Sequence, residues 1–213
     1  MKILFDSARP GDPRSQSSIL CENPVTVLDE TDGFEGIKTV LKDHAPATPH
    51  PNNGIFHGGA AGVIGFDGTM RVGIYTHVTH NPLAPEPDPF PPVTLQAEVD
   101  DADYAEKIQK VIDYIHAGDI FQACLSRRFS AKRPNGFEPM AHYGHLRCIN
   151  PAPFSAFVDM GDVTLSCTSP ERFLRVQNGR VETRPIKGTL PDTDNPENLL
   201  LNAKECAENA MIV

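Results

Sequence analysis

Six prolines between His80 and Pro92 constrain the fold of this chain more than any other feature of its sequence. Proline has no amide proton to donate and fixes its own φ angle, so a stretch this dense cannot form a helix or a central strand. We therefore expect a semi-extended connector. The sequence predicts three regions: residues 1–80, an N-terminal subdomain of short strands; residues 81–100, the connector; and residues 101–213, a region that mixes helices and strands.

Charge and cysteine content exclude several classes of protein. Lys and Arg number 19 against 28 Asp and Glu, and a net charge of −9 without a basic stripe argues against nucleic-acid binding. Apolar runs are too short to cross a bilayer, so we expect no membrane association. The five cysteines are scattered and lack CxxC spacing, which is typical of reduced thiols. We therefore predict a cytoplasmic protein.

Glycines punctuate residues 55–75, within the short strands expected before the connector. A phosphate-binding loop is one interpretation, but the segment has no GK[ST] and no helical pattern after it. We favour tight bends or close packing between strands.

Beyond the connector, helical and strand patterns alternate. Asp103 is a suitable N-cap, and apolar residues recur at helical spacing from Tyr104 to Ile115 before Gly118, which predicts an amphipathic helix that docks one face. The dipeptide Asn178-Gly179 predicts a hairpin. The pattern also predicts a strand over 120–129, a helix over 140–149, strands near 154–160, 163–167, 173–176 and 181–183, and a helix over 198–213.

Glu171 and Lys187 stand at the entrance and the exit of the predicted hairpin. If residues 177–179 form a three-residue loop, Glu171 faces Pro185 and Lys187 lies diagonally on the same face, about 7–8 Å away. A two-residue turn would place the pair on opposite faces, so a catalytic role requires the longer loop. Without further context, a surface ion pair is the alternative.

Two other places collect charged side chains. Glu205 and Glu208 are three residues apart on the predicted last helix, where they could hold Mg²⁺ or form a solvated surface. Arg127 and Arg128 could bind an anion, although a surface position is the simpler interpretation.

Five ordered motifs resemble the chorismate-utilising enzymes, a family that includes anthranilate synthase component I, aminodeoxychorismate synthase component I, isochorismate synthase and salicylate synthase. The motifs are AGDIFQACLSRRF (117–129), NPAPFSAF (150–157), TSPERFL (168–174), TRPIKGTLP (183–191) and AKECAENAMIV (203–213). The resemblance implies an α/β (α+β) fold, a sandwich of two antiparallel sheets with flanking helices. It also implies that the C-terminal portion of that fold is missing, so residues 101–213 would be the first part of a chorismate-binding domain.

One residue distinguishes branches of this family. Anthranilate synthases resemble the chain but carry alanine at the position of Lys187, whereas the lysine form is similar to the p-aminobenzoate branch, aminodeoxychorismate synthase component I. The resemblance then implies that Lys187 attacks ring carbon C2 of chorismate as the C4 hydroxyl leaves, with Glu171 as general acid. Ammonia adds at C4 and expels the lysine, which gives 4-amino-4-deoxychorismate.

The resemblance assigns further residues and partners. Gly188 and Thr189 would contact chorismate, and Glu208 would bind Mg²⁺. A glutamine amidotransferase subunit would supply ammonia. Four residues match positions that hold tryptophan in relatives and could form an effector pocket: Ser7, Pro153, Phe154 and Ser155.

Two alternatives remain for the function. The chain could instead be an anthranilate synthase component I, or a non-catalytic fragment that only docks the amidotransferase. As a truncated chain, it is expected to be inactive alone.

Overall fold

The computed structural model of the protein describes residues 1–15, 17–46, 54–89, 91–188, 190, 195 and 197–212. They form two compact units, one from Met1–Asp88 together with Pro139–Val213 and the other from Pro89–Glu138. This division differs from the predicted regions 1–80, 81–100 and 101–213. The first unit combines residues from both predicted outer regions, because segments far apart in the sequence share a sheet.

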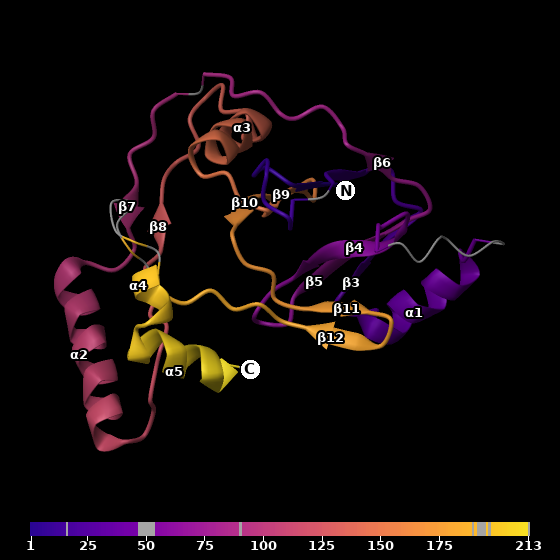
Figure 1. Ribbon diagram of the computed structural model, residues 1–213. Helices are drawn as coiled ribbons and strands as arrows, with labels where there is room; N and C mark the ends of the chain where they lie inside the picture. The colour runs from indigo at the N-terminus through magenta and orange to yellow at the C-terminus, as the bar shows by residue number, and fades with distance from the viewer. Residues whose placement is uncertain are drawn as a thin grey trace. The chain divides into compact units, whose positions relative to one another are not determined.

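The first unit is built around an antiparallel sheet of five strands in the order β10-β9-β1-β2-β6 (Figure 1). Its strands are β1 (Lys2–Asp6), β2 (Ile19–Cys21), β6 (Thr79–His80), β9 (Phe154–Asp159) and β10 (Thr164–Ser169). In the centre, Leu4 of β1 pairs with Leu20 on one side and with Phe157 on the other. The N-terminal strand is therefore held by a strand from the second half of the chain.

A second antiparallel sheet contains β3 (Thr26–Asp29), β5 (Met70–Tyr75) and β4 (Gly59–Ile64), in that order. Gly62 of β4 faces β5 so closely that a Cβ atom would lie 2.2 Å from the Arg71 carbonyl oxygen and 2.6 Å from the Val72 Cα. The glycine-rich segment thus forms most of two closely packed strands, β4 and β5, as the interpretation of close strand packing predicts.

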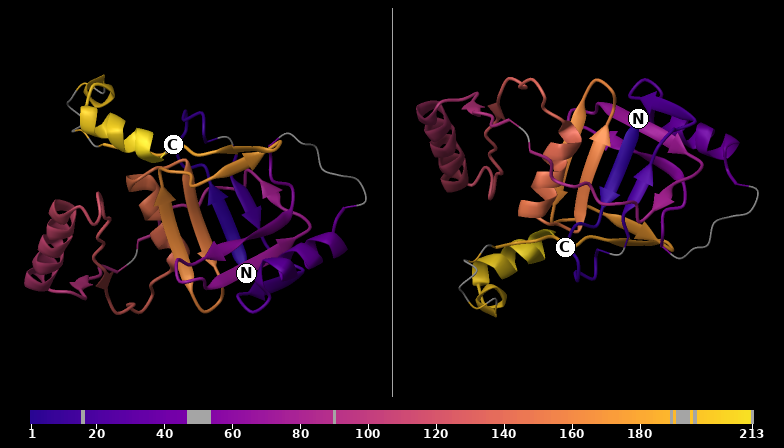
Figure 2. Two further views of the ribbon diagram at one scale, coloured as in Figure 1. Left: turned by 90° about the horizontal axis from the view of Figure 1, so that it is seen from below. Right: turned by 90° about the horizontal axis from the view of Figure 1, so that it is seen from above.

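Buried side chains stack the first unit into four layers, which Figure 1 shows edge-on. Figure 2 shows the two sheets face-on. Helix α1 (Gly33–Asp43) covers the outer face of the three-stranded sheet, and α3 (Pro139–Ile149) covers the outer face of the five-stranded sheet. The cluster between the two sheets consists of Ile3, Cys21, Ala61, Tyr75 and Val158. This arrangement agrees with the predicted sandwich of antiparallel sheets with flanking helices. Helix α1 was not predicted, because Gly33 and Gly36 weaken its helical pattern.

A buried carboxylate connects the central strand β1 to α3. Asp6 is 4% exposed, and it accepts hydrogen bonds from the Tyr143 hydroxyl (2.9 Å), from Arg147 Nε (2.6 Å) and from the Ser18 hydroxyl (3.1 Å). Burial and the neighbouring Asp6 carboxylate raise the pKa of Tyr143, so its hydroxyl remains a donor. Each group that is taken out of water here has a partner, which is the condition under which buried charges are tolerated.

The second unit contains α2 (Asp101–Ala117) and a ribbon of β7 (Gln96–Ala97) and β8 (Phe129–Ser130). The predicted helix is confirmed, and Gly118 ends it in the left-handed conformation, with a φ of 81°. Its N-cap, however, is Asp100, whose side chain accepts a hydrogen bond from the Asp103 amide at 2.8 Å. None of the residues of α2 is buried, so the expected docking of its apolar face is not seen in the described part of the chain.

The strand predicted over 120–129 is wrong, because only Phe129 and Ser130 form a strand there. Arg127 instead turns back toward the start of α2. Its Nε and Nη2 atoms donate to the Val99 carbonyl oxygen at 2.9 and 2.6 Å, and Nη2 pairs with Asp101 at 2.7 Å. Arg127 is therefore half-buried within its own unit rather than a surface residue, whereas Arg128 is exposed, as expected, and pairs with Glu98.

The remaining predicted elements are largely confirmed. Helix α3 and strands β9 and β10 match their predicted ranges, and the hairpin consists of β11 (Arg175–Gln177) and β12 (Arg180–Glu182). The helix predicted over 198–213 is broken into α4 (Glu197–Leu200) and α5 (Ala203–Ile212). The break comes from Asn202, whose Oδ1 accepts from the amides of Lys204 (3.0 Å) and Glu205 (3.3 Å) and so caps α5.

All five cysteines are free thiols, and across the described ranges no helix has the length and apolar character needed to cross a membrane.

The thiol of Cys21 is expected to be much less reactive than the other four. It is fully buried between the sheets, and burial raises its pKa to about 11, whereas Cys124, Cys148, Cys167 and Cys206 are exposed. With a chromogenic disulfide reagent at pH 8, four thiols react quickly and the fifth reacts only after denaturation. In the Cys21→Ala variant, folded and denatured protein should give the same count. Rapid reaction of all five thiols in the folded protein would contradict the packing described here.

Substitution of Asp6 by asparagine is expected to lower the free energy of unfolding by about 3 kcal/mol, because the Arg147 guanidinium would remain buried without its counter-charge. The matched control is Asp162→Asn, which removes the carboxylate that pairs with the more exposed Arg71. The control should unfold at nearly the wild-type denaturant concentration. Equal losses in the two variants, measured by urea denaturation, would show that the buried network does not stabilise the fold.

Candidate functional site

The hairpin that carries the predicted catalytic pair has a two-residue turn. Arg175 pairs with Glu182 and Gln177 pairs with Arg180, which leaves Asn178 and Gly179 as the turn. Both have positive φ angles, 53° and 72°, as a type I′ turn requires. The prediction of a three-residue loop, on which the expected catalytic geometry depends, is therefore wrong.

The strand pairing stops before it reaches the predicted catalytic residues. Beyond the pair of Arg175 and Glu182, the register of a two-residue turn would set Glu171 opposite Ile186. There, Glu171 Oε1 accepts a hydrogen bond from the Ile186 amide at 3.2 Å. The Glu171 side chain thus reaches the backbone one residue before Lys187. Among the described residues, however, no hydrogen bond or ion pair joins Glu171 to Lys187 itself.

The two segments differ in exposure. Glu171 is exposed, and the Ser169 hydroxyl both donates to its carbonyl oxygen (2.9 Å) and accepts from its amide (3.2 Å). Lys187 and Gly188 are half-buried, and Gly188 has a φ of 76°, a conformation that favours glycine. Thr189, the other predicted substrate contact, lies outside the described residues.

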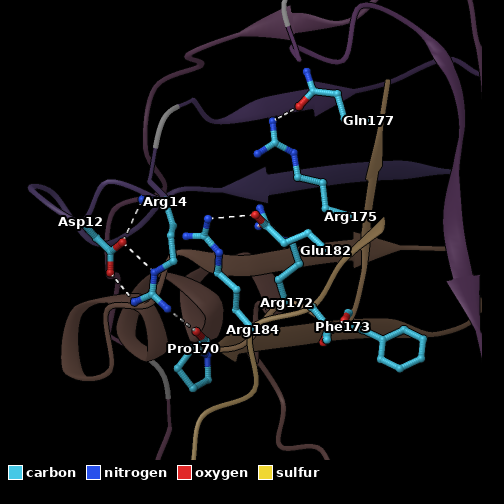
Figure 3. Close-up of polar contacts among 10 residues, drawn as sticks. Asp12, Arg14, Pro170, Arg172, Phe173, Arg175, Gln177, Glu182 and Arg184 are labelled. Atoms are coloured by element: carbon cyan, nitrogen blue, oxygen red, sulfur yellow. Dashed lines mark hydrogen bonds and ion pairs between the residues drawn. The ribbon is translucent and has the colours of Figure 1, made fainter. Parts of the chain in front are cut away.

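The base of the hairpin is held by charged side chains (Figure 3). Glu182 pairs with Arg172, and its Oε2 accepts from Arg184 Nη2 at 2.9 Å. The hydrogen bond from Arg184 and the charges of Arg172 and Arg175 lower the pKa of Glu182, so its carboxyl is ionised at neutral pH. The sequence analysis missed the cluster of Glu182, Arg172 and Arg184, although Arg184 lies within the motif that carries Lys187 and Glu182 directly precedes that motif.

The four residues of the predicted effector pocket come together. Ser7, Pro153, Phe154 and Ser155 all line a cavity of about 480 Å³ in the first unit. The cavity is also lined by residues that were not predicted: Phe5, Phe56, Phe173, Arg14 and Arg172. The aromatic walls suit a planar ligand, while the two guanidinium groups already pair with carboxylates, Arg14 with Asp12 and Arg172 with Glu182.

Glu171 lines the same cavity, so the predicted catalytic carboxylate and the predicted effector residues share a wall. Arg14, from the segment between β1 and β2, also lines this cavity. The side chain of Arg14 donates two hydrogen bonds to Asp12, at 2.8 and 2.6 Å, and its Nη1 lies 3.5 Å from the carbonyl oxygen of Pro170 (Figure 3). The pairing with Arg14 lowers the pKa of Asp12, which therefore stays ionised.

The two carboxylates of α5 lie on one side of the helix, as predicted. Lys204 Nζ lies 3.5 Å from both Glu205 Oε1 and Glu208 Oε1, and the two carboxylates raise the pKa of Lys204. Glu205 is 9% exposed, and its Oε2 is buried without a hydrogen-bond partner among the described residues.

This donor set fits Mg²⁺, which is usually bound by one or two carboxylates together with water or substrate oxygens. The described residues contain no cluster of three His, Cys, Asp or Glu side chains that could hold a metal ion. A bound Mg²⁺ would therefore need oxygen ligands of other kinds besides these two glutamates.

Comparison with known proteins places this arrangement in a family. Residues 27–213 match the sequence profile of a family described as chorismate binding enzyme. The chain is 31% identical to aminodeoxychorismate synthase component 1 of Salmonella typhimurium over an alignment 251 positions long, with 94% of this chain and 55% of that protein covered. It is 42% identical over 126 residues to anthranilate synthase component 1 of Thermus thermophilus, covering 56% of this chain and 27% of that protein.

The fold has a counterpart among solved structures. The crystal structure of anthranilate synthase component I from Streptococcus pneumoniae superposes with a TM-score of 0.74 and 22% sequence identity, over 95% of this chain and 60% of that one. The chain thus spans little more than half the length of the Salmonella relative and 60% of this structural neighbour. The family match over residues 27–213 and the shared α/β fold agree with the motifs, and the chain belongs to the family of chorismate-binding enzymes.

Proposed function

We propose that this chain is part of component I of an aminodeoxychorismate synthase and supplies catalytic residues for the amination of chorismate to 4-amino-4-deoxychorismate. The observation that carries the proposal is the placement of Glu171, whose carboxylate is held on the amide next to Lys187. The lysine in the PIKGT segment favours this branch over anthranilate synthesis, and the 31% identical Salmonella protein covers nearly the whole chain.

The proposed chemistry uses Lys187 as the nucleophile. Its amine forms a bond to ring carbon C2 while the bond between C4 and its hydroxyl breaks, and Glu171 protonates the hydroxyl, which leaves as water. Ammonia then bonds to C4 as the bond between C2 and Nζ breaks. The proton that the new ammonium group loses returns to Glu171, so both residues end in their starting states. Gly188, with its positive φ, would let the ligand approach the backbone closely.

The proposed cofactor is Mg²⁺, which Glu208 would bind. Glu205 on the same helix has a buried oxygen without a hydrogen-bond partner among the described residues and could serve as a second ligand. A bound Mg²⁺ would offset the negative charge of a chorismate carboxylate, which matters in a chain with a net charge of −9.

Two partners complete the proposal. Ammonia would come from a glutamine amidotransferase subunit, and the 480 Å³ cavity would take an aromatic amino acid as effector, through Ser7, Pro153, Phe154 and Ser155.

Anthranilate synthesis is the second candidate, favoured by the 42% identity to the Thermus thermophilus protein over the aligned half of the chain. The product distinguishes the two reactions, because amination at C2 gives anthranilate whereas amination at C4 gives aminodeoxychorismate. A chain that binds an amidotransferase but neither binds nor converts chorismate would instead be a docking fragment.

The Lys187→Ala variant is expected to lose amination at C4. Because the chain is expected to be inactive alone, wild-type protein and variant are each combined with a complementing chain that supplies the C-terminal portion of the fold and are incubated with chorismate, ammonium and Mg²⁺. The products are separated by chromatography, and mass spectrometry searches for an adduct on Lys187. The control is Lys110→Ala, which removes an exposed lysine of α2. Undiminished C4 amination by Lys187→Ala would contradict the lysine mechanism, and a wild-type chain that neither binds chorismate nor forms the adduct would contradict the proposed function.

The Glu208→Gln variant is expected to bind divalent metal at least about tenfold more weakly, because one anionic ligand is lost. Binding is measured without substrate by electron paramagnetic resonance of Mn²⁺, which substitutes for Mg²⁺. Glu106→Gln on α2 serves as the matched control. Equal Mn²⁺ affinity in wild type and Glu208→Gln would remove Glu208 from the metal site.

A further inference from the structure

Strand pairing does not hold the segments that carry Glu171 and Lys187. The ladder ends at Arg175 and Glu182. If it continued in the same register, the side chains of Glu171 and Lys187 would turn to opposite faces of the ribbon, because successive strand residues alternate in direction. A role for both residues in one reaction therefore depends on contacts that replace the ladder beyond this point.

Contacts that involve side chains replace the ladder between residues 171 and 186. The Thr183 hydroxyl donates to the Phe173 carbonyl oxygen at 3.0 Å, and the Ile186 amide donates to Glu171. In addition, Glu182 pairs with Arg172 across the hairpin and with Arg184 on its own side of the hairpin.

Glu182 is central to this set because it is the anion shared by the two arginines. Arg172 follows Glu171 directly, and Arg184 lies three residues before Lys187. The Glu182 side chain is about one third exposed, so it remains in contact with water. Its pKa is lowered by the hydrogen bond from Arg184 and by the charges of both arginines, so the carboxylate is ionised while it pairs with both guanidinium groups. One carboxylate thus fixes the residue next to the proposed acid and the strand that leads to the proposed nucleophile.

Arg172 also ties the hairpin to the core of the first unit. Its guanidinium carbon lies 5.4 Å from the centre of the Phe154 ring on β9, and its side chain is 23% exposed. Because β9 pairs with the central strand β1, this contact anchors Arg172 to the five-stranded sheet.

We propose that Glu182 is a positioning residue for chorismate amination: by bridging Arg172 and Arg184, it keeps Glu171 on the Ile186 amide and so sets the acid beside the nucleophile. The inference rests on the proposed function for its catalytic consequence, while the structural link from Glu182 to Ile186 stands on the contacts above. Glu182 does not itself touch the reacting atoms.

The structural part is tested by hydrogen exchange of the Ile186 amide in the whole chain, followed by nuclear magnetic resonance or mass spectrometry. In Glu182→Ala, exchange should become roughly tenfold faster than in the wild type, because the local opening no longer breaks the two ion pairs. Glu182→Asp keeps the charge and should recover part of the protection. The control is Glu98→Gln, which removes an exposed Glu–Arg pair in the other unit and should leave Ile186 unchanged.

The catalytic part is tested by the rate of C4 amination in the presence of a complementing chain that supplies the C-terminal portion of the fold, because this chain is expected to be inactive alone. Glu182→Ala should lower kcat roughly tenfold with little change in KM for chorismate, since misplacement of the acid affects the chemical step more than binding. Glu182→Asp should recover part of kcat, and thermal unfolding should show that both variants remain folded.

The outcomes separate this inference from the proposed function. Unchanged exchange of Ile186 in Glu182→Ala overturns the inference, and so does faster exchange with an unchanged kcat. If Lys187→Ala aminates chorismate normally, or if the wild type neither binds chorismate nor forms the Lys187 adduct, the proposed function fails, and the exchange of Ile186 still decides whether Glu182 holds the segment.

Discussion

The buried carboxylate of Asp6 is the interaction on which the first unit depends. It stands at the end of the central strand and receives hydrogen bonds from α3 and from the segment before β2. A charge in this position is tolerated only because each of its neighbours is also satisfied. It therefore fixes how α3 lies on the sheet. The cavity lined by Ser7 and Phe154 opens beside the same strand end, so its shape depends on the same contact.

The hairpin shows a different principle, in which charged side chains take over where backbone pairing stops. A type I′ turn gives a short, well-formed ladder but the wrong register for two side chains on one face. The contacts of Glu171, Thr183 and Glu182 beyond the ladder are individually weak, since most of them are partly exposed. Such contacts suit a site that must adjust to a ligand, because they can shift without unfolding the sheet.

Much of this arrangement could be predicted from the sequence, and the failures have physical causes. Helices α2 and α3 and strands β9 and β10 were predicted because their patterns are long and regular. Helix α1 was missed because two glycines interrupt it. The strand over 120–129 was wrong because Arg127 bonds to a distant carbonyl that no local pattern reveals. The hairpin was located correctly, but Asn178-Gly179 also fits a two-residue turn, and local sequence alone did not select between the two registers.

The central position of β1 has a consequence for biosynthesis. Residues 2–6 leave the ribosome long before residues 154–159, yet one edge of this strand pairs only with those later residues. Until then the strand exposes unpaired amides and carbonyls beside apolar side chains, a state that favours association with other chains. The five-stranded sheet therefore cannot close before β9 and β10 have been made, and we expect this long-range pairing to make its folding slow compared with that of helical proteins.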